Sequence, residues 1–228
     1  MEGKYTIAIV VEGNEEECLF DIAKACNGID SCFDVELVVS NGYGEIGPYF
    51  QDSYSNPSVD CVVAVYDVDD RSKKEDSPFA IVRNELLSVL GDETAVDMVS
   101  FCTNPNILQI LLLGCDEFER IKIASSSKKV NSEIVSKYWP KISSKEKDGK
   151  KIKNGYEATK WQLEIIKNSY IYEEDVSYNY ETLLENAAKL NSNYKNNLPG
   201  SNIYDLLKSL KNGDIQFFNK IKKKTKGD

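Results

Sequence analysis

Runs of consecutive apolar residues mark the first half of the chain. β-branched and other apolar side chains fill residues 5–11, 35–39 and 61–66 with few polar interruptions, and a shorter run spans 98–102. Runs of this length and composition are typical of strands that are buried on both faces of a sheet. They predict four strands, each with helices packed above and below it.

Helical periodicity separates these apolar runs. Apolar positions recur at helical spacing over residues 15–26 and 78–90, where Asn14 and Pro78 are typical of helix starts, and a weaker pattern spans 48–54. Strands that alternate with helices favour a mostly parallel, three-layer sheet. The pattern therefore predicts the α/β class.

The pattern changes beyond residue 121. Helical periodicity now alternates with connectors rich in lysine, serine and asparagine, the longest of which spans 141–154. The chain therefore divides into an α/β domain over residues 1–120 and a basic helical region over 121–228. We expect further helices at 107–113, 132–139, 156–168, 180–191, 203–210 and 215–223.

Carboxylates follow two of the predicted strands at the point where each strand ends. Val10-Val11-Glu12-Gly13 closes the first run, and Tyr66-Asp67-Val68-Asp69-Asp70 closes the third. Open α/β sheets build their sites at such strand ends, and a cluster of carboxylate oxygens suits a hard divalent cation such as Mg²⁺. The alternative is a set of solvated loop acids, which are common at strand ends.

The distribution of charge adds a second indication. The net charge of −9 combines −17 over residues 1–120 with +8 over 121–228. An acidic half can hold cations and a basic half can hold a polyanion, as expected when a metal site cuts a phosphate backbone that is bound elsewhere. A dipolar surface without such a role is the alternative.

The composition excludes several kinds of chemistry. The chain has no histidine, which excludes a Ser-His-Asp triad, a Cys-His dyad and His-ligated zinc. Its six cysteines form no C-x-x-C pair and are typical of buried thiols in a reducing compartment. No apolar stretch approaches the ~20 residues of a membrane span, and the N-terminus does not resemble a signal peptide. We therefore expect a cytoplasmic protein.

The two acidic motifs resemble the TOPRIM domain of topoisomerases, bacterial primases, OLD nucleases and small rRNA-maturing nucleases. The resemblance covers about residues 5–120 and implies a Rossmann-like, mostly parallel sheet with helices on both faces, followed here by a helical C-terminal extension. Within this family, Val10-Val11-Glu12-Gly13-Asn14-Glu15-Glu16-Glu17 is similar to the glutamate motif of RloB-like proteins from bacterial antiphage islands. Thr103-Asn104-Pro105, followed by an apolar segment, is similar to their Ser-Asn-Pro segment, although Ile107 to Gln109 replace its usual aromatic and acidic residues.

The resemblance implies a role for each acid. Glu12 corresponds to a metal ligand or general acid/base, and Asp67 and Asp69 to the metal ligands of the Asp-x-Asp motif. Asp70 replaces or supports one of these, and Glu16 corresponds to an acid that some of these nucleases use for a second metal. Glu15 and Glu17 point elsewhere on a helix and are expected to be solvated.

Other polar residues are candidates for substrate contacts. Each has a simpler explanation: loop cations are often solvated, Asn104 fits a helix cap, and a terminal lysine run is often only solubilising. The glycine-punctuated loop 41–47 lacks phosphate-loop spacing, so a connector is favoured over a phosphate cradle. The candidates are Arg71, Lys73, Asn104, Lys160, Lys222 and Lys223.

The motifs together predict a nuclease that depends on Mg²⁺ or Mn²⁺, cleaves RNA, tRNA or DNA, and acts in antiphage defence. Two alternatives stay open. The first is a non-catalytic binding or sensor subunit of a defence complex, with an ATPase or another subunit as its partner. The second is a regulatory protein whose acidic face mimics nucleic acid, which would leave the strand-end placement of the acids unexplained.

Overall fold

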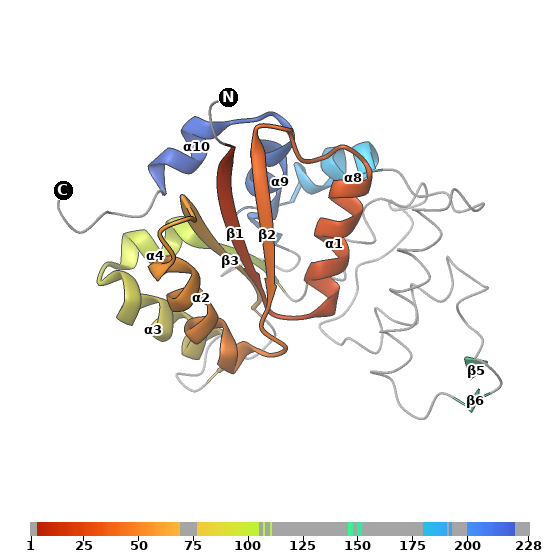
Figure 1. Ribbon diagram of the computed structural model, residues 1–228. Coiled ribbons are helices and arrows are strands. Elements are labelled where there is room, and N and C mark those ends of the chain that lie inside the picture. Colours follow the sequence, from red (N-terminus) through yellow and green to blue (C-terminus); the bar gives the residue numbers. More distant parts are fainter. Residues whose placement is uncertain are drawn as a thin grey trace.

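The central element of the protein is a five-stranded sheet with strand order β2-β1-β3-β4-β7. The computed structural model describes residues 4–68, 77–104, 107, 110, 146–147, 150–151, 180–190, 192 and 200–221. The first four strands are parallel and β7 is antiparallel, so the expected α/β class and mostly parallel sheet are confirmed (Figure 1). The strands are β1 (Tyr5–Val11), β2 (Phe33–Val39), β3 (Cys61–Asp67), β4 (Ser100–Asn104) and β7 (Gly200–Ser201). A separate pair, β5 (Glu146–Lys147) and β6 (Lys150–Lys151), is antiparallel.

Helices cover both faces of this sheet (Figure 1). Alternate side chains of β1 enter different cores: Ile7 and Ile9 face one side, Ala8 and Val10 face the other, and all four are fully buried. Burial on both faces explains why the strand is a continuous apolar run. The first face carries α1 (Asn14–Ala25), α8 (Tyr180–Ala187), α9 (Ile203–Lys211) and α10 (Ile215–Lys220). The second carries the 3-10 turn η1 (Tyr43–Glu45), α2 (Ile46–Ser55), α3 (Pro78–Leu90) and α4 (Glu93–Val99).

Helix caps correct two of the predicted boundaries. Asp92 accepts hydrogen bonds from the backbone N–H groups of Thr94 and Ala95, at 3.1 and 3.2 Å, and starts α4 there. Met98 and Val99, expected at the start of a strand, therefore continue this helix, and β4 begins only at Ser100. The N-cap of α1 is Gly13 rather than Asn14.

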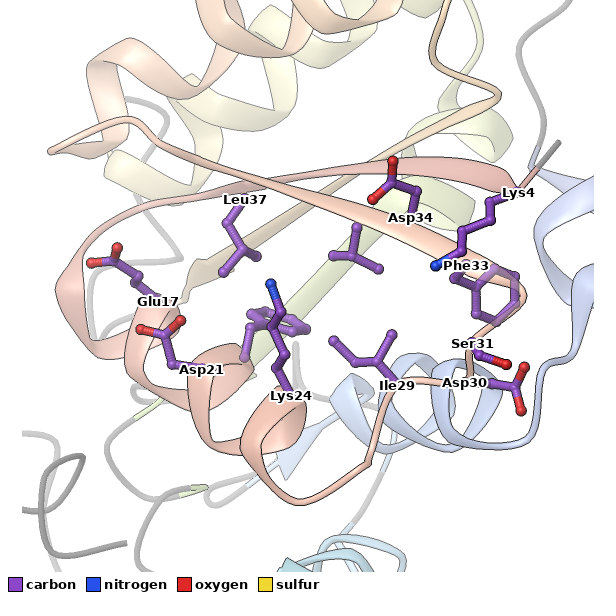
Figure 2. Close-up of a pocket in the computed structure, with 12 residues that line it drawn as sticks. Lys4, Glu17, Asp21, Lys24, Ile29, Asp30, Ser31, Phe33, Asp34 and Leu37 are labelled. Atoms are coloured by element: carbon purple, nitrogen blue, oxygen red, sulfur yellow. The ribbon is translucent and has the colours of Figure 1, made fainter. Parts of the chain in front are cut away.

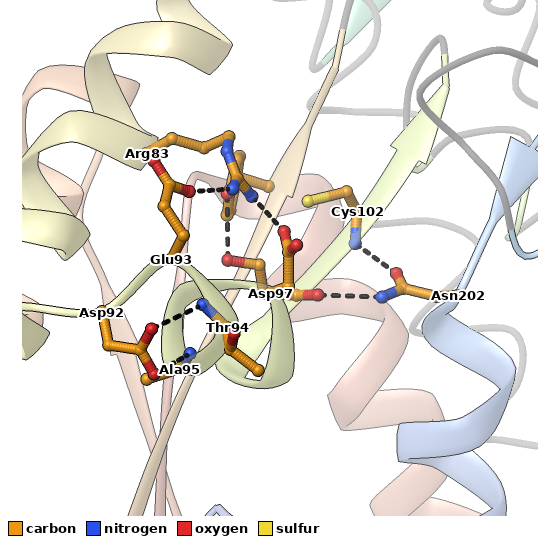
Figure 3. A network of polar contacts seen from close by, with 10 residues as sticks. Arg83, Asp92, Glu93, Thr94, Ala95, Asp97, Cys102 and Asn202 are labelled. Atoms are coloured by element: carbon orange, nitrogen blue, oxygen red, sulfur yellow. Dashed lines mark hydrogen bonds and ion pairs between the residues drawn. The ribbon is translucent and has the colours of Figure 1, made fainter.

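Ion pairs join α3 to α4 on the second face (Figure 3). The guanidinium of Arg83 donates to Glu93 at 2.8 Å and to Asp97 at 2.7 Å. Both acids are exposed, so these pairs contribute modestly to stability.

Apart from the separate β5–β6 pair, the described part of the C-terminal half belongs to the same sheet and the same first core. Beside β7, the side-chain amide of Asn202 extends the pairing with β4: its Oδ1 accepts from Cys102 N at 2.7 Å, and its Nδ2 donates to the Ser100 carbonyl at 2.8 Å (Figure 3). Leu206 and Phe218 lie fully buried among β-strand and α1 side chains. Helices α8, α9 and α10 occur where helical spacing predicted them, whereas the expected helices 107–113, 132–139 and 156–168 and the boundary at residue 120 fall largely or wholly outside the described residues.

None of the described helices has the length and hydropathy that crossing a membrane requires. Cys61 and Cys102 are buried thiols, and Cys26 and Cys32 are partly buried thiols. Within the described residues, these cysteines therefore act as small side chains in or beside the two cores.

Candidate metal centre

The direction of chain winding reverses at β1. The connection through α1 leads from β1 to β2 on one side, and the connection through α2 then crosses to β3 on the other side. In open α/β sheets, such a reversal opens a crevice at the carboxyl ends of the two strands that flank it. Val11 pairs with Val65 in this register, so Glu12 and Asp67 lie at that edge.

Three carboxylates come together at this crevice. One oxygen from each of Glu12, Glu16 and Asp67 lies within 4.8 Å of the other two. Glu16 and Asp67 are buried, at 2% and 5% exposure, and Glu12 is partly buried. Glu12 and Asp67 come from adjacent strand ends, and Glu16 comes from the first turn of α1. The structure thus brings together three of the five acids that the motifs assigned to metal.

A backbone N–H group orients each of these carboxylates. Oε2 of Glu12 accepts from Asp67 N at 3.2 Å, and Oδ1 of Asp67 accepts from Ile107 N at 2.7 Å. Oε2 of Glu16 accepts from Gly13 N at 2.9 Å, which also closes the first turn of α1. The positive end of the helix dipole adds to the stability of a charge at Glu16. Donors on the main chain move little, so the three side chains are held in place before any ligand arrives.

The loop after β2 packs directly against Glu12. The Ser40 hydroxyl lies within 3.0 to 3.2 Å of the carbonyl oxygens of Val11, Glu12 and Gly42, and Gly42 N donates to the Glu12 carbonyl at 2.9 Å. Gly42 has φ of +145°, a conformation that side chains other than glycine rarely adopt. This loop therefore fixes the backbone of Glu12. The sequence interpretation missed this role, although the polar residues that follow β2 could have suggested it.

A surface pocket of about 140 Å³ opens beside the cluster. Glu12, Glu15, Glu16 and the loop residues Asn41 and Gly42 are among the residues that line it. The expectation that Glu15 is solvated is wrong, because it is only 8% exposed and faces this pocket. The pocket supplies space for a small ligand next to two of the three acids.

The remaining predicted site residues are divided between the same edge and the undescribed parts of the chain. Asn104 ends β4 at 9% exposure, one residue beyond Thr103, which pairs with Asp67. It therefore lies at the same edge of the sheet as the acid cluster. The other predicted residues lie outside the described residues: Asp69, Asp70, Arg71, Lys73, Lys160, Lys222 and Lys223.

The donor set fits a hard divalent cation. Mg²⁺ binds oxygen at about 2.0–2.1 Å, so two of its ligands lie at most about 4.2 Å apart, and the 4.8 Å limit here exceeds that by about 0.6 Å. Small side-chain rotations would bring the three oxygens within bonding distance of Mg²⁺ or of the larger Ca²⁺, whose bonds are about 2.3–2.6 Å. Two carboxylates 4.8 Å apart repel each other by about 0.9 kcal/mol in water and about 3.5 kcal/mol at a dielectric constant of 20. A bound cation would remove this repulsion.

The fold and the cluster together define an α/β protein with a candidate divalent-cation site at the switch point of its sheet. Searches against protein-family models, curated proteins and solved structures found no match for this chain. The resemblance to TOPRIM and RloB-like proteins therefore stays a prediction from the motifs.

Proposed function

We propose that this protein is a nuclease of the TOPRIM type that uses Mg²⁺ or Mn²⁺ to cleave phosphodiester bonds in RNA, tRNA or DNA. The observation that carries the proposal is the convergence of Glu12, Glu16 and Asp67 at the switch point of the sheet. The resemblance of the two acidic motifs supplies the reaction class. The narrower resemblance to RloB-like proteins supplies the biological role, which is antiphage defence.

The proposed chemistry depends on carboxylates, since the chain has no histidine. Glu16 and Asp67 would hold the cation through carboxylates that backbone N–H groups orient. Glu12 is either a third ligand or the group that accepts a proton from the attacking water. A bound Mg²⁺ would polarise a phosphoryl oxygen and make water nucleophilic near neutral pH. Asp69 and Asp70 complete the ligand set that the motif implies.

Affinity for the substrate is assigned mainly to the basic half of the chain. Its net charge of +8 is opposite to that of nucleic acid, whereas the acidic half repels nucleic acid unless metal is bound. Replacing Lys222 and Lys223 with Gln should lower the slope of log affinity against log salt by about 0.7 to 0.9 for each phosphate that the protein no longer neutralises, with no change in metal affinity. The proposed substrate-binding residues are Arg71, Lys73, Asn104, Lys160, Lys222 and Lys223.

A cleavage assay tests the proposed activity. End-labelled tRNA, single-stranded RNA and duplex DNA are incubated with the protein in Mg²⁺, Mn²⁺, Ca²⁺ or EDTA. Cleavage should require Mg²⁺ or Mn²⁺ and should fall at least ~10²-fold in Glu12→Gln, which keeps the shape of the side chain and loses its charge. Glu36→Gln is the matched control, because Glu36 is exposed on β2. Full cleavage by Glu12→Gln would refute the assignment, and metal binding without cleavage would favour the non-catalytic binding subunit.

A further inference from the structure

A second and larger pocket lies between α1 and the edge strand β2 (Figure 2). Its volume is about 500 Å³, and its floor is apolar, formed by Phe20, Ile29, Phe33, Val35 and Leu37. Charged side chains of α1 stand beside this floor, among them Glu17 and Asp21. We call this pocket the β2 groove. The proposed nuclease activity does not use it.

The β2 groove runs alongside an open edge of the sheet. Among the described strands, β2 pairs only with β1, so the backbone groups on its other side face outward. Such an edge is a template for one more strand. The side chains of Phe33, Val35 and Leu37 lie on the α1 side of the sheet. An added strand would therefore place alternate side chains over the apolar floor of the groove, as in other proteins that bind peptides by strand addition.

The negative charges on β2 indicate which kind of strand could pair with it. Asp34 and Glu36 are exposed and alternate with the floor residues, so they belong to the other face of the strand. In an antiparallel pair of two β2 strands centred on Val35, Asp34 of each copy would lie opposite Glu36 of the other, which is destabilising. These acids therefore disfavour a second copy of this chain in that register. A strand with Lys or Arg at alternate positions would instead meet opposite charges.

The α1 side chains that border the groove are also compatible with a basic strand. Glu17 and Asp21 stand together at one end of the groove and add negative charge there (Figure 2). Lys24 extends over the apolar floor, and no ion pair involves it within the described residues. Its flexible four-carbon stem can swing aside and continue to cover apolar surface elsewhere.

We propose that the β2 groove binds an extended segment of a partner protein, in which apolar residues alternate with Lys or Arg, by adding it to the sheet as a strand beside β2. The backbone of β2 supplies hydrogen bonds, the apolar floor takes every second side chain, and Asp34 and Glu36 pair with the basic residues between them. The proposal does not depend on metal binding or on nuclease activity.

The test uses a fluorescent seven-residue peptide in which Lys alternates with Val, and measures its affinity by anisotropy. Asp34→Lys/Glu36→Lys should weaken binding at least about tenfold, which corresponds to about 1.4 kcal/mol. Asp52→Lys/Asp205→Lys changes the net charge equally at two exposed acids of α2 and α9, and should bind within twofold of the unmodified protein. Hydrogen exchange of residues 33–39 should slow when the peptide is bound.

A second peptide separates strand addition from simple charge attraction. It has the same side chains with alternate backbone nitrogens methylated, and should bind the unmodified protein at least tenfold more weakly. Equal losses in the two double variants, equal affinity for the two peptides, or unchanged exchange in β2 would each overturn the proposal. A dimer of the free protein that protects β2 would assign the edge to a second copy and would overturn it as well. The peptide comparison needs no variant, so it holds even if the β2 variant folds poorly.

Discussion

Asp67→Asn is the substitution that most directly tests the candidate metal centre. Asn has the shape of Asp, and its amide oxygen can still accept the 2.7 Å hydrogen bond from Ile107 N. The substitution therefore removes one of the three carboxylate charges while it keeps the local backbone contacts. We expect the variant to fold normally and to bind divalent cations poorly.

The size of the effect follows from the ligand count. Substitution of residues that only orient a metal ligand typically costs 10- to 100-fold in affinity, so loss of one of three ligands should cost at least about 100-fold. At 100 times its Kd, Mn²⁺ stabilises the unmodified protein by about 2.7 kcal/mol, which for a chain of 228 residues raises the Tm by about 5 to 11 °C. At the same concentration the variant gains about 0.4 kcal/mol, or about 1 to 2 °C.

Thermal unfolding with and without Mn²⁺ measures this difference, and calorimetric titration gives the two Kd values. Asp34→Asn is the matched control, because Asp34 is exposed and pairs with Thr6 at the opposite end of the strands. Its Mn²⁺-dependent shift should equal that of the unmodified protein. A full shift in Asp67→Asn, or a reduced shift in Asp34→Asn, would place the cation elsewhere.

Three further substitutions and one control substitution test the packing around the sheet. Asn202→Ala removes both hydrogen bonds to β4 and should lower the free energy of unfolding in urea by about 1 to 3 kcal/mol. Burial, with a smaller effect of a neighbouring thiol and carboxylate, raises the pKa of Tyr5, and its hydroxyl has no hydrogen-bond partner among the described residues. Tyr5→Phe should therefore stabilise the protein by about 1 kcal/mol at pH 7. Its advantage should grow above about pH 10, where an unfolded tyrosine loses its proton before the native one does, as urea unfolding across pH can show. In Gly28→Ala the new Cβ would lie 2.5 Å from a ring carbon of Tyr180, so we expect a loss of about 1 to 3 kcal/mol, whereas Gly44→Ala meets no atom within 4 Å and should change stability by less than about 0.5 kcal/mol in the same assay.

The local elements of the fold could be predicted because their signals are local. A strand buried on both faces must be apolar at every position, as residues 7–11 and 61–66 are, and the start of α3 carries a proline that suits the first turn of a helix. The α4–β4 boundary could not be predicted from the same pattern, since Met98 and Val99 suit either structure. The cap at Asp92 settles it by starting a helix that includes them.

The candidate site shows the same division. The sequence by itself determined which residues end the strands and that carboxylates stand there. Only the tertiary structure decided that β1 and β3 are neighbours, which brings the Glu12 side chain to the backbone of Asp67 across 55 positions of the chain. It also decided that Glu15 is buried and that a two-residue strand near residue 200 pairs with β4. These features depend on contacts between distant segments, and the residues in each segment carry no local signal that identifies their partners.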